Sequence, residues 1–371
     1  MIVGVPKEIK KLEFRVGLTP ASVREYVTHG HDVLVEAGAG AGIGARDEEY
    51  VAAGARIAAE PAEIFATADL VVKVKEPLAS EWPQLREGQI LFTFLHLAAD
   101  PQQAAGLLDS GVTAIAYETV ADAEGRLPLL APMSEVAGRL SIEAAAAALR
   151  TSSGGRGLLM GGVPGVQPAR VVVIGGGVVG THAARMALGL GAEVSIVDRS
   201  VARLRELEQL FGGRVRTRYS TLAAIEDELA FADAVIGAVL VPGASAPRLV
   251  SRQMLGRMRP GAVLVDVAID QGGCFENSRP TTHDQPTFEI DGIIHYCVAN
   301  MPGSVPLTSS HALNNATLPY GLEIADGGLE AVRSSRSLIQ GVNVHRGSLA
   351  SRAVGESLGL PYRSAEDLLA S

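Results

Sequence analysis

The stretch from Arg170 to Asp198, RVVVIGGGVVGTHAARMALGLGAEVSIVD, decides the fold of this chain. Its β-branched start, residues 171–174, predicts a fully buried strand. Residues 175–180 then match the pattern G-x-G-x-x-G, a helical pattern follows over about residues 181–190, and a second apolar strand ends at Asp198. Strand, glycine turn, helix and strand, with an acid roughly 20 residues after the glycines, predict a dinucleotide-binding unit.

Each glycine of this pattern has a physical reason. Gly175 permits the tight turn off the strand, Gly177 lets the backbone approach a pyrophosphate, and Gly180 lets the helix pack closely on the strand. The start of the helix offers unpaired N–H groups and a partial positive charge. The sequence therefore predicts that a pyrophosphate binds where this helix begins.

The acid at the end of the second strand predicts which dinucleotide binds. Asp198 can accept hydrogen bonds from the ribose hydroxyls and would repel a 2′-phosphate, which favours NAD. Arg199 and Arg203 leave NADP open as an alternative, since a nearby arginine can accommodate that phosphate.

Bulk properties exclude several classes of partner. A length of 371 residues suits two domains with separate cores. The net charge of −9, with no basic block, argues against nucleic acid. The two cysteines, Cys274 and Cys297, have no metal-ligand spacing, and the plain interpretation is a reducing cytoplasm. We expect no leader and no membrane span.

Strands and helices alternate along the chain, which predicts an α/β fold with two Rossmann-like domains and mainly parallel sheets. We expect long helices to join these domains and a cleft to lie between them. Residues 1–128 and 307–371 are expected to form the substrate domain, and residues 129–306 the NAD-binding domain. The expected strands cover residues 2–5, 32–36, 70–74, 89–95, 112–116, 171–174, 193–197, 234–241, 263–268 and 295–298.

Other segments complete this outline. Ser134 can cap an alanine-rich helix over about residues 135–150, which we expect to connect the domains. The polar residues 282–289 are expected to form a loop. Helical patterns over residues 318–325 and 349–358 predict that the tail returns to the first domain.

Polar side chains follow several expected strands directly. Lys75, His96, Asp270 and the pair Asn300-Met301 all stand in such positions. Ligands of open parallel sheets bind beyond the carboxyl ends of the strands. Histidine titrates near neutral pH and suits proton exchange beside a hydride transfer. These residues are therefore candidates for a catalytic site.

Each candidate also has a plainer interpretation. His96, in LFTFLHLAA, would suit a satisfied core position; Lys75 could point to water, and Asp270 could only form a turn. Arg15, in FRVGLTP, could be an ordinary surface arginine or a bidentate clamp for a carboxylate. Asp266, inside an apolar strand, is interpreted as a buried, hydrogen-bonded acid.

Over its whole length the chain resembles the bacterial L-alanine dehydrogenases. The matching stretches, in the family's order, are GVPKEIKKLEFRVGLTP, VVKVKEP, FTFLHLAAD, APMSEVAGRLS, VVVIGGGVVG, VDVAIDQGGCFE and HYCVANMPGSVP. The resemblance implies a cytoplasmic homohexamer that converts L-alanine, NAD and water reversibly into pyruvate, NADH and ammonium. It also implies that the two ends of the chain form the substrate domain.

The resemblance implies roles for individual residues. Arg15 and Lys75 match the binders of the substrate carboxylate and carbonyl. His96 matches the general acid/base. Asp270 matches the acid that orients or activates the attacking water or ammonia.

Further matches surround these residues. Met133 and Met301 match side chains that wall the substrate site. The matches to dinucleotide contacts, beside the three glycines of the turn, are Ser134, Val178, Asp198, Arg203, Ser220, Val239, Leu240, Val267, Ala268, Ile269, Asp270, Arg279, Val298, Ala299, Asn300 and Met301.

The chain departs from the family pattern at two places. Phe94 stands where some members carry tyrosine, which puts a hydroxyl near the substrate in doubt. Some members pair a residue matching Glu323 with a histidine one turn later to hold magnesium. Gly327 occupies that position here, so no metal is predicted.

Other functions remain open on the sequence. The nearest alternative is the NAD-binding component of a proton-translocating transhydrogenase, which shares the architecture. The segment 134–139, SEVAGR, favours the dehydrogenase. A saccharopine-forming dehydrogenase and a non-catalytic NAD-binding module are the remaining alternatives.

Overall fold

The computed structural model describes residues 1–239 and 246–370. It divides into two compact units, one made of Met1–Met133 with Gly303–Ser371 and the other of Ser134–Pro302. Within the described residues, no helix combines the length and the apolar character that crossing a membrane requires.

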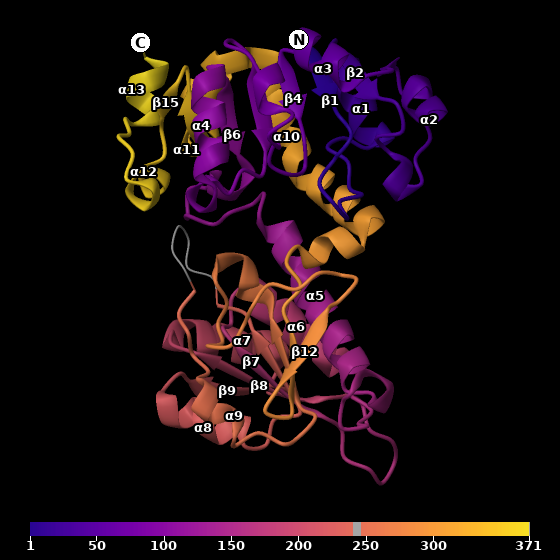
Figure 1. Cartoon of the computed structure of the whole chain (residues 1–371), viewed down its shortest axis with the longest axis vertical. Coiled ribbons are helices and arrows are strands. Elements are labelled where there is room, and N and C mark those ends of the chain that lie inside the picture. The colour runs from indigo at the N-terminus through magenta and orange to yellow at the C-terminus, as the bar shows by residue number, and fades with distance from the viewer. Residues whose placement is uncertain (240–245, 371) are drawn as a thin grey trace. The chain divides into compact units, whose positions relative to one another are not determined.

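The first unit contains a mainly parallel sheet (Figure 1), whose described strands run in the order β15-β14-β6-β5-β4-β1-β2-β3. The strands from β3 to β6 are parallel, and their order reverses between β1 and β4, as in a doubly wound fold. β14 pairs antiparallel with β6 and β15 with β14. The bounds are β1 (Ile2–Val5), β2 (Asp32–Glu36), β3 (Arg56–Ala58), β4 (Leu70–Val72), β5 (Ile90–Thr93), β6 (Thr113–Ala116), β14 (Val342–His345) and β15 (Ser348–Leu349).

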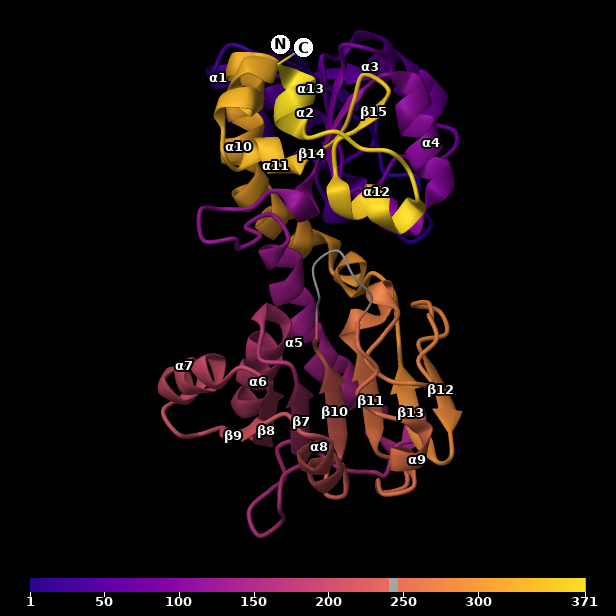
Figure 2. The same ribbon diagram turned by 90° about the vertical axis from the view of Figure 1, so that its left-hand side faces the viewer.

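Helices pack against this sheet (Figure 2). Four of them begin with proline, whose missing N–H costs nothing in a first turn. The hydroxyl of Thr19 caps the first helix by accepting a hydrogen bond from the Ser22 N–H. The helices are α1 (Pro20–Thr28), α2 (Asp47–Ala52), α3 (Pro61–Thr67), α4 (Pro101–Ser110), α10 (Pro306–Ser334), α11 (Leu338–Gly341), α12 (Arg352–Leu358) and α13 (Ala365–Leu369).

The sheet of the second unit has the described order β12-β13-β11-β10-β7-β8-β9. All neighbours are parallel except β12 with β13, and the order reverses between β7 and β10. This is the strand order of a dinucleotide-binding Rossmann fold with one antiparallel edge strand. The strands are β7 (Arg170–Ile174), β8 (Glu193–Asp198), β9 (Arg216–Tyr219), β10 (Ala234–Gly237), β11 (Val263–Asp266), β12 (Thr287–Ile290) and β13 (Ile293–Tyr296).

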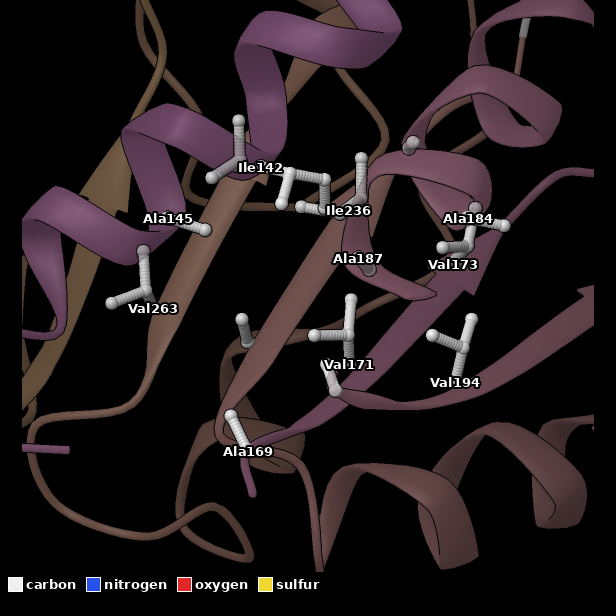
Figure 3. Packing of buried hydrophobic residues seen from close by; sticks show 14 of the residues in the cluster. Ile142, Ala145, Ala169, Val171, Val173, Ala184, Ala187, Val194, Ile236 and Val263 are labelled. Carbon is white, nitrogen blue, oxygen red and sulfur yellow. The ribbon is translucent and has the colours of Figure 1, made fainter. Parts of the chain in front are cut away.

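Both faces of this second sheet are covered by apolar side chains. On one face, Ile142 and Ala145 of α5 and Ala184 of α6 pack on Val171 of β7 and Val263 of β11 (Figure 3). On the other face, residues of α8 and α9 pack on the alternate residues of the same strands. The helices are α5 (Ala131–Ala148), α6 (Val178–Gly189), α7 (Val201–Phe211), α8 (Leu222–Leu229) and α9 (Arg252–Leu255).

The predicted α/β class with two mainly parallel sheets is confirmed. The predicted return of the tail to the first unit is also confirmed, because β14 adds a strand beside β6. The predicted strands 2–5, 32–36, 112–116 and 171–174 end where the observed strands end. The predicted strands 70–74, 89–95, 234–241, 263–268 and 295–298 run past the carboxyl ends of β4, β5, β10, β11 and β13, because apolar residues continue beyond the last ladder hydrogen bonds.

Three local predictions are wrong. Ser134 does not cap the connecting helix, because α5 already begins at Ala131 and Pro132 fits its first turn. The segment 282–289 is not wholly a loop, since β12 pairs its second half with β13. The segment 349–358 is not one helix, because Leu349 ends β15 before α12 begins.

Candidate functional site

The glycine turn of the second unit joins β7 to α6. Gly175 has a φ of 103°, a backbone conformation that is strained for any residue with a side chain. A Cβ on Gly180 would lie 1.8 Å from the Gly175 carbonyl oxygen, whereas a Cβ on Gly177 would meet no atom of the described residues within 4 Å. Among the described residues, no side chain caps the start of α6 at Val178. Open space beside uncapped helix N–H groups fits a pyrophosphate.

A polar clamp holds the middle of this turn. The Gly176 N–H donates to Asp198 Oδ2 at 2.7 Å, and the Gly176 carbonyl accepts from Arg203 Nε at 2.7 Å. The Arg203 guanidinium also donates to the Thr181 hydroxyl at 2.8 Å and pairs with Glu206 at 2.6 Å. Asp198 and Arg203 thus fix the turn whose geometry suits a dinucleotide.

The other predicted dinucleotide contacts in this unit lie around the same edge. Val239 follows β10, residues 267–270 form a 3-10 turn after β11, and residues 298–301 follow β13. Because these strands are parallel neighbours, their carboxyl ends meet at one edge of the sheet. Asp270 is exposed there, and Met301 is buried.

The remaining predicted contacts are placed as follows. The Ser220 N–H donates to the Asp198 carbonyl at 3.0 Å. The Arg279 guanidinium lies 4.4 Å from the centre of the Phe288 ring. Ser134 lies within α5, and Leu240 lies outside the described residues.

Asp266 is the buried, hydrogen-bonded acid that its position in an apolar strand predicts. Its Oδ2 accepts from the N–H groups of Cys274 and Phe275 and from the Ser278 hydroxyl. Burial nevertheless raises the pKa of Asp266. These bonds hold the 274–278 segment against β11, directly beside the turn that carries Asp270.

In the first unit, Arg15 is buried rather than on the surface. Its Nε and Nη2 donate to the two carboxylate oxygens of Glu13, each at 2.6 Å, and its Nη1 lies 3.1 Å from Met133 Sδ. Two of the predicted substrate residues, Arg15 and Met133, are therefore in contact. Glu13 orients the guanidinium.

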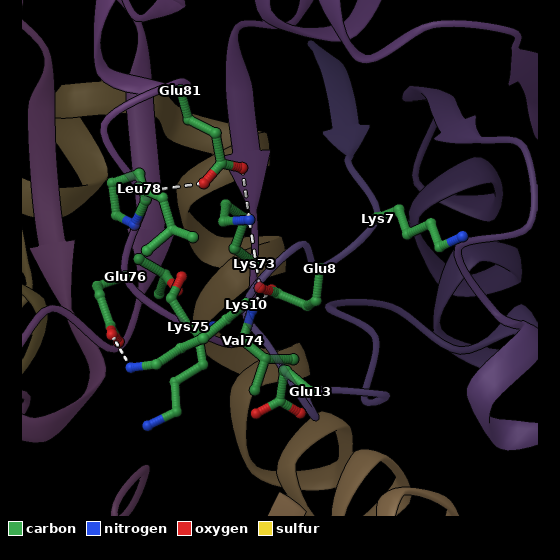
Figure 4. Close-up of polar contacts among 12 residues, drawn as sticks. Lys7, Glu8, Lys10, Glu13, Lys73, Val74, Lys75, Glu76, Leu78 and Glu81 are labelled. Carbon is green, nitrogen blue, oxygen red and sulfur yellow. Dashed lines mark hydrogen bonds and ion pairs between the residues drawn. The ribbon is translucent and has the colours of Figure 1, made fainter.

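Lys75 follows β4 and is also buried, beside an ionic cluster (Figure 4). The Lys73 ammonium lies 2.8 Å from Glu81 and 3.3 Å from Glu8. Burial would lower the pKa of Lys73, but these two carboxylates raise it above its usual value. Glu8 Oε1 also accepts from the Val74 and Lys75 N–H groups, so the cluster fixes the backbone that carries Lys75.

His96 follows β5 and is half-exposed, so the core interpretation of this histidine is wrong. Its backbone is left-handed, with φ 51°. Its ring stacks on Phe94 with 5.7 Å between centroids. The Glu118 carboxylate accepts from the His96 N–H at 2.6 Å.

Arg15, Lys75 and His96 follow β1, β4 and β5, so the three candidates share the carboxyl edge of the first sheet. The sequence reasoning missed their partners Glu13, Glu8 and Glu118. Glu118 stands two residues beyond β6, so the rule that found His96 applies to it as well. Among the described residues, no three histidine, cysteine or acidic side chains form a group suited to a metal ion.

Two family models cover most of the chain. The model of the alanine dehydrogenase/PNT N-terminal domain matches residues 4–137, and that of the alanine dehydrogenase/PNT C-terminal domain matches residues 141–352. The chain belongs to the alanine dehydrogenase/PNT family. The match spans both compact units.

Relatives within this family match over their full length. The chain is 56% identical to the alanine dehydrogenases of Halomonas elongata and of Mycobacterium tuberculosis strain H37Rv, over 100% of each chain. It is 53% identical to the alanine dehydrogenase of Bacillus subtilis, over 100% of this chain and 98% of the relative.

Among solved structures, an alanine dehydrogenase is more similar to the chain than a transhydrogenase is. An L-alanine dehydrogenase aligns with a TM-score of 0.93 and 52% identity, over 97% of this chain and 99% of that chain. A transhydrogenase from Sinorhizobium meliloti aligns with a TM-score of 0.82 and 28% identity, over 94% and 100%.

Proposed function

We propose that this chain catalyses the reversible, NAD-dependent oxidative deamination of L-alanine to pyruvate and ammonium. The observation that carries the proposal is 51–56% identity with named alanine dehydrogenases over the whole chain. The glycine turn supports it, since the open space at Gly177 and the clamp on Gly176 fit a dinucleotide.

The site residues have the following proposed roles. Arg15 and Lys75 bind the substrate carboxylate, because both are cations held in place at one sheet edge. His96 moves the proton, since its half-exposed imidazole can reach a ligand beyond β5. Once the α-carbon has lost its hydride and become an iminium carbon, Asp270 positions the water that adds to it, and ammonia then leaves. When bound, NAD supplies the hydride acceptor.

An absorbance assay tests this proposal. NADH should form from L-alanine and NAD, and should be consumed with pyruvate and ammonium. His96→Ala should abolish turnover while NADH binding, followed by fluorescence, survives. Full activity of that variant would remove His96 from the scheme.

The same assay separates the alternatives. A panel of 2-oxo acids that includes 2-oxoglutarate with lysine would reveal a saccharopine-forming enzyme. NADH binding without turnover would indicate a transhydrogenase component or a binding module. The lower identity to the transhydrogenase, 28% against 52%, favours the dehydrogenase.

We also propose a homohexamer in the cytoplasm. Leu159, Val163 and Val166 are 64%, 53% and 59% exposed on one glycine-rich segment, and such an apolar patch favours contact with another copy. Light scattering on the purified chain should give six copies per particle. A monomer at micromolar concentration would contradict this.

A further inference from the structure

Glu118 lies beside His96 because of how the first sheet is built. β5 and β6 are parallel neighbours, with Thr93 opposite Ala116. The residues that follow these strands therefore emerge at the same edge. Glu118 stands in the 3-10 turn after β6, and His96 in the turn after β5. The two residues are 22 positions apart in sequence.

The Glu118 carboxylate holds the backbone on which His96 stands. Its Oε1 accepts from the His96 N–H at 2.6 Å, and both of its oxygens lie 3.2 Å from the Leu95 nitrogen. Bonds to an ionised acceptor are stronger than neutral ones. The side chain of Glu118 is only 15% exposed, so solvent screens these bonds weakly.

This anchor supports an unfavourable backbone conformation. A φ of 51° is rare for a residue with a side chain, because the Cβ is crowded in left-handed backbone. Such a conformation persists only where its surroundings over-determine it. Here two kinds of contact hold His96 in this conformation. The Leu95 and His96 N–H groups donate to Glu118, and the His96 ring stacks on Phe94 with 4° between the ring planes.

The same carboxylate also faces the imidazole. His96 Nδ1 lies 3.8 Å from Glu118 Oε1, too far for a hydrogen bond but within ion-pair range when the ring is protonated. A carboxylate beside a catalytic histidine orients its ring and stabilises the imidazolium that forms during proton transfer.

We propose that Glu118 is the positioning residue for His96: it fixes the backbone and stabilises the protonated ring during alanine turnover. This rests on the role proposed above for His96. Glu118 needs no contact with alanine or NAD for this, because it acts through His96.

Glu118→Gln removes the charge of residue 118 and keeps an acceptor for the backbone hydrogen bonds. The amide oxygen of glutamine can still accept from the Leu95 and His96 N–H groups, but it carries no charge to stabilise the imidazolium. Glu124→Gln is the matched control, because Glu124 is exposed and pairs only with Arg126 among the described ion pairs.

The experiment measures alanine oxidation by the full chain together with NADH affinity. For Glu118→Gln we expect kcat to fall at least about tenfold, with the KM for alanine and the NADH Kd within about twofold of the unmodified chain. The solvent deuterium isotope effect on kcat should rise, because proton transfer becomes slower. Glu118→Asp should recover part of the rate, and Glu124→Gln should behave as the unmodified chain.

Two results would overturn the inference. One is an unchanged kcat in Glu118→Gln; the other is a parallel loss of NADH affinity and alanine KM without a change in isotope effect, which indicates a structural role. If Glu118→Gln does not fold, the same measurements on Glu118→Asp test the inference. Aspartate is one methylene shorter, so its charge lies farther from the His96 ring. His96→Ala distinguishes the two proposals: if it is inactive while Glu118→Gln is normal, only the role of Glu118 fails.

Discussion

His295 should make the stability of this chain depend on pH. It lies on β13 with no exposed surface, and both of its ring nitrogens are buried without a hydrogen-bond partner among the described residues. Its ring stacks on Phe288 with 5.0 Å between centroids. Burial lowers the pKa of His295 from 6.5 to about 4. The folded chain therefore holds this ring neutral where the unfolded chain protonates it.

The sign and size of the effect follow from proton linkage. A depressed pKa in the folded state means that the contribution to stability is complete above the unfolded pKa and is lost as the pH falls toward about 4. Between pH 7.5 and pH 5 the loss is about 2 kcal/mol. It equals the change in RT times the logarithm of the ratio of the proton-binding terms of His295, 1 + 10^(pKa − pH), in the unfolded and the folded chain. Leucine has no proton to bind, so His295→Leu removes this loss.

Urea unfolding at pH 7.5 and pH 5 measures the effect, at one fixed protomer concentration because assembly also changes stability. The unfolding free energy of the unmodified chain minus that of His295→Leu should fall by about 2 kcal/mol between the two pH values. His311→Leu is the control, since His311 is exposed. An equal difference at both pH values would refute the reasoning.

Two further predictions concern the two units separately. Gly180→Ala should abolish NADH binding measured by fluorescence, because the new Cβ would lie 1.8 Å from the Gly175 carbonyl oxygen and force the turn apart. Gly189→Ala, at an open position on the same helix, is the control. Normal NADH affinity in Gly180→Ala would contradict the prediction. Lys73→Met should lower the unfolding free energy by roughly 3–5 kcal/mol, because it leaves Glu8 and Glu81 buried without their cation; a calorimetric midpoint unchanged from the unmodified chain would show that the carboxylates find other partners.

Much of the fold could be predicted from local pattern. The strand before Gly175 and the helix after it follow from a β-branched run and a glycine turn, whose backbone preferences are set by sterics. The carboxyl-end rule then located Lys75 and His96, because parallel strands present their following residues at one edge. Edge strands such as β12 were missed because their polar, half-exposed residues resemble a loop.

The sequence by itself determined the alternation of strands and helices, the glycine turn and the strand ends where ligands bind, because each depends on neighbouring residues. Only the tertiary structure decided which charges meet: Glu118 with His96, and Glu8 with Lys73, 65 positions away. It also decided that the His96 backbone is left-handed. Periodicity carries no information on such pairs, since the pairing of distant strands brings them together.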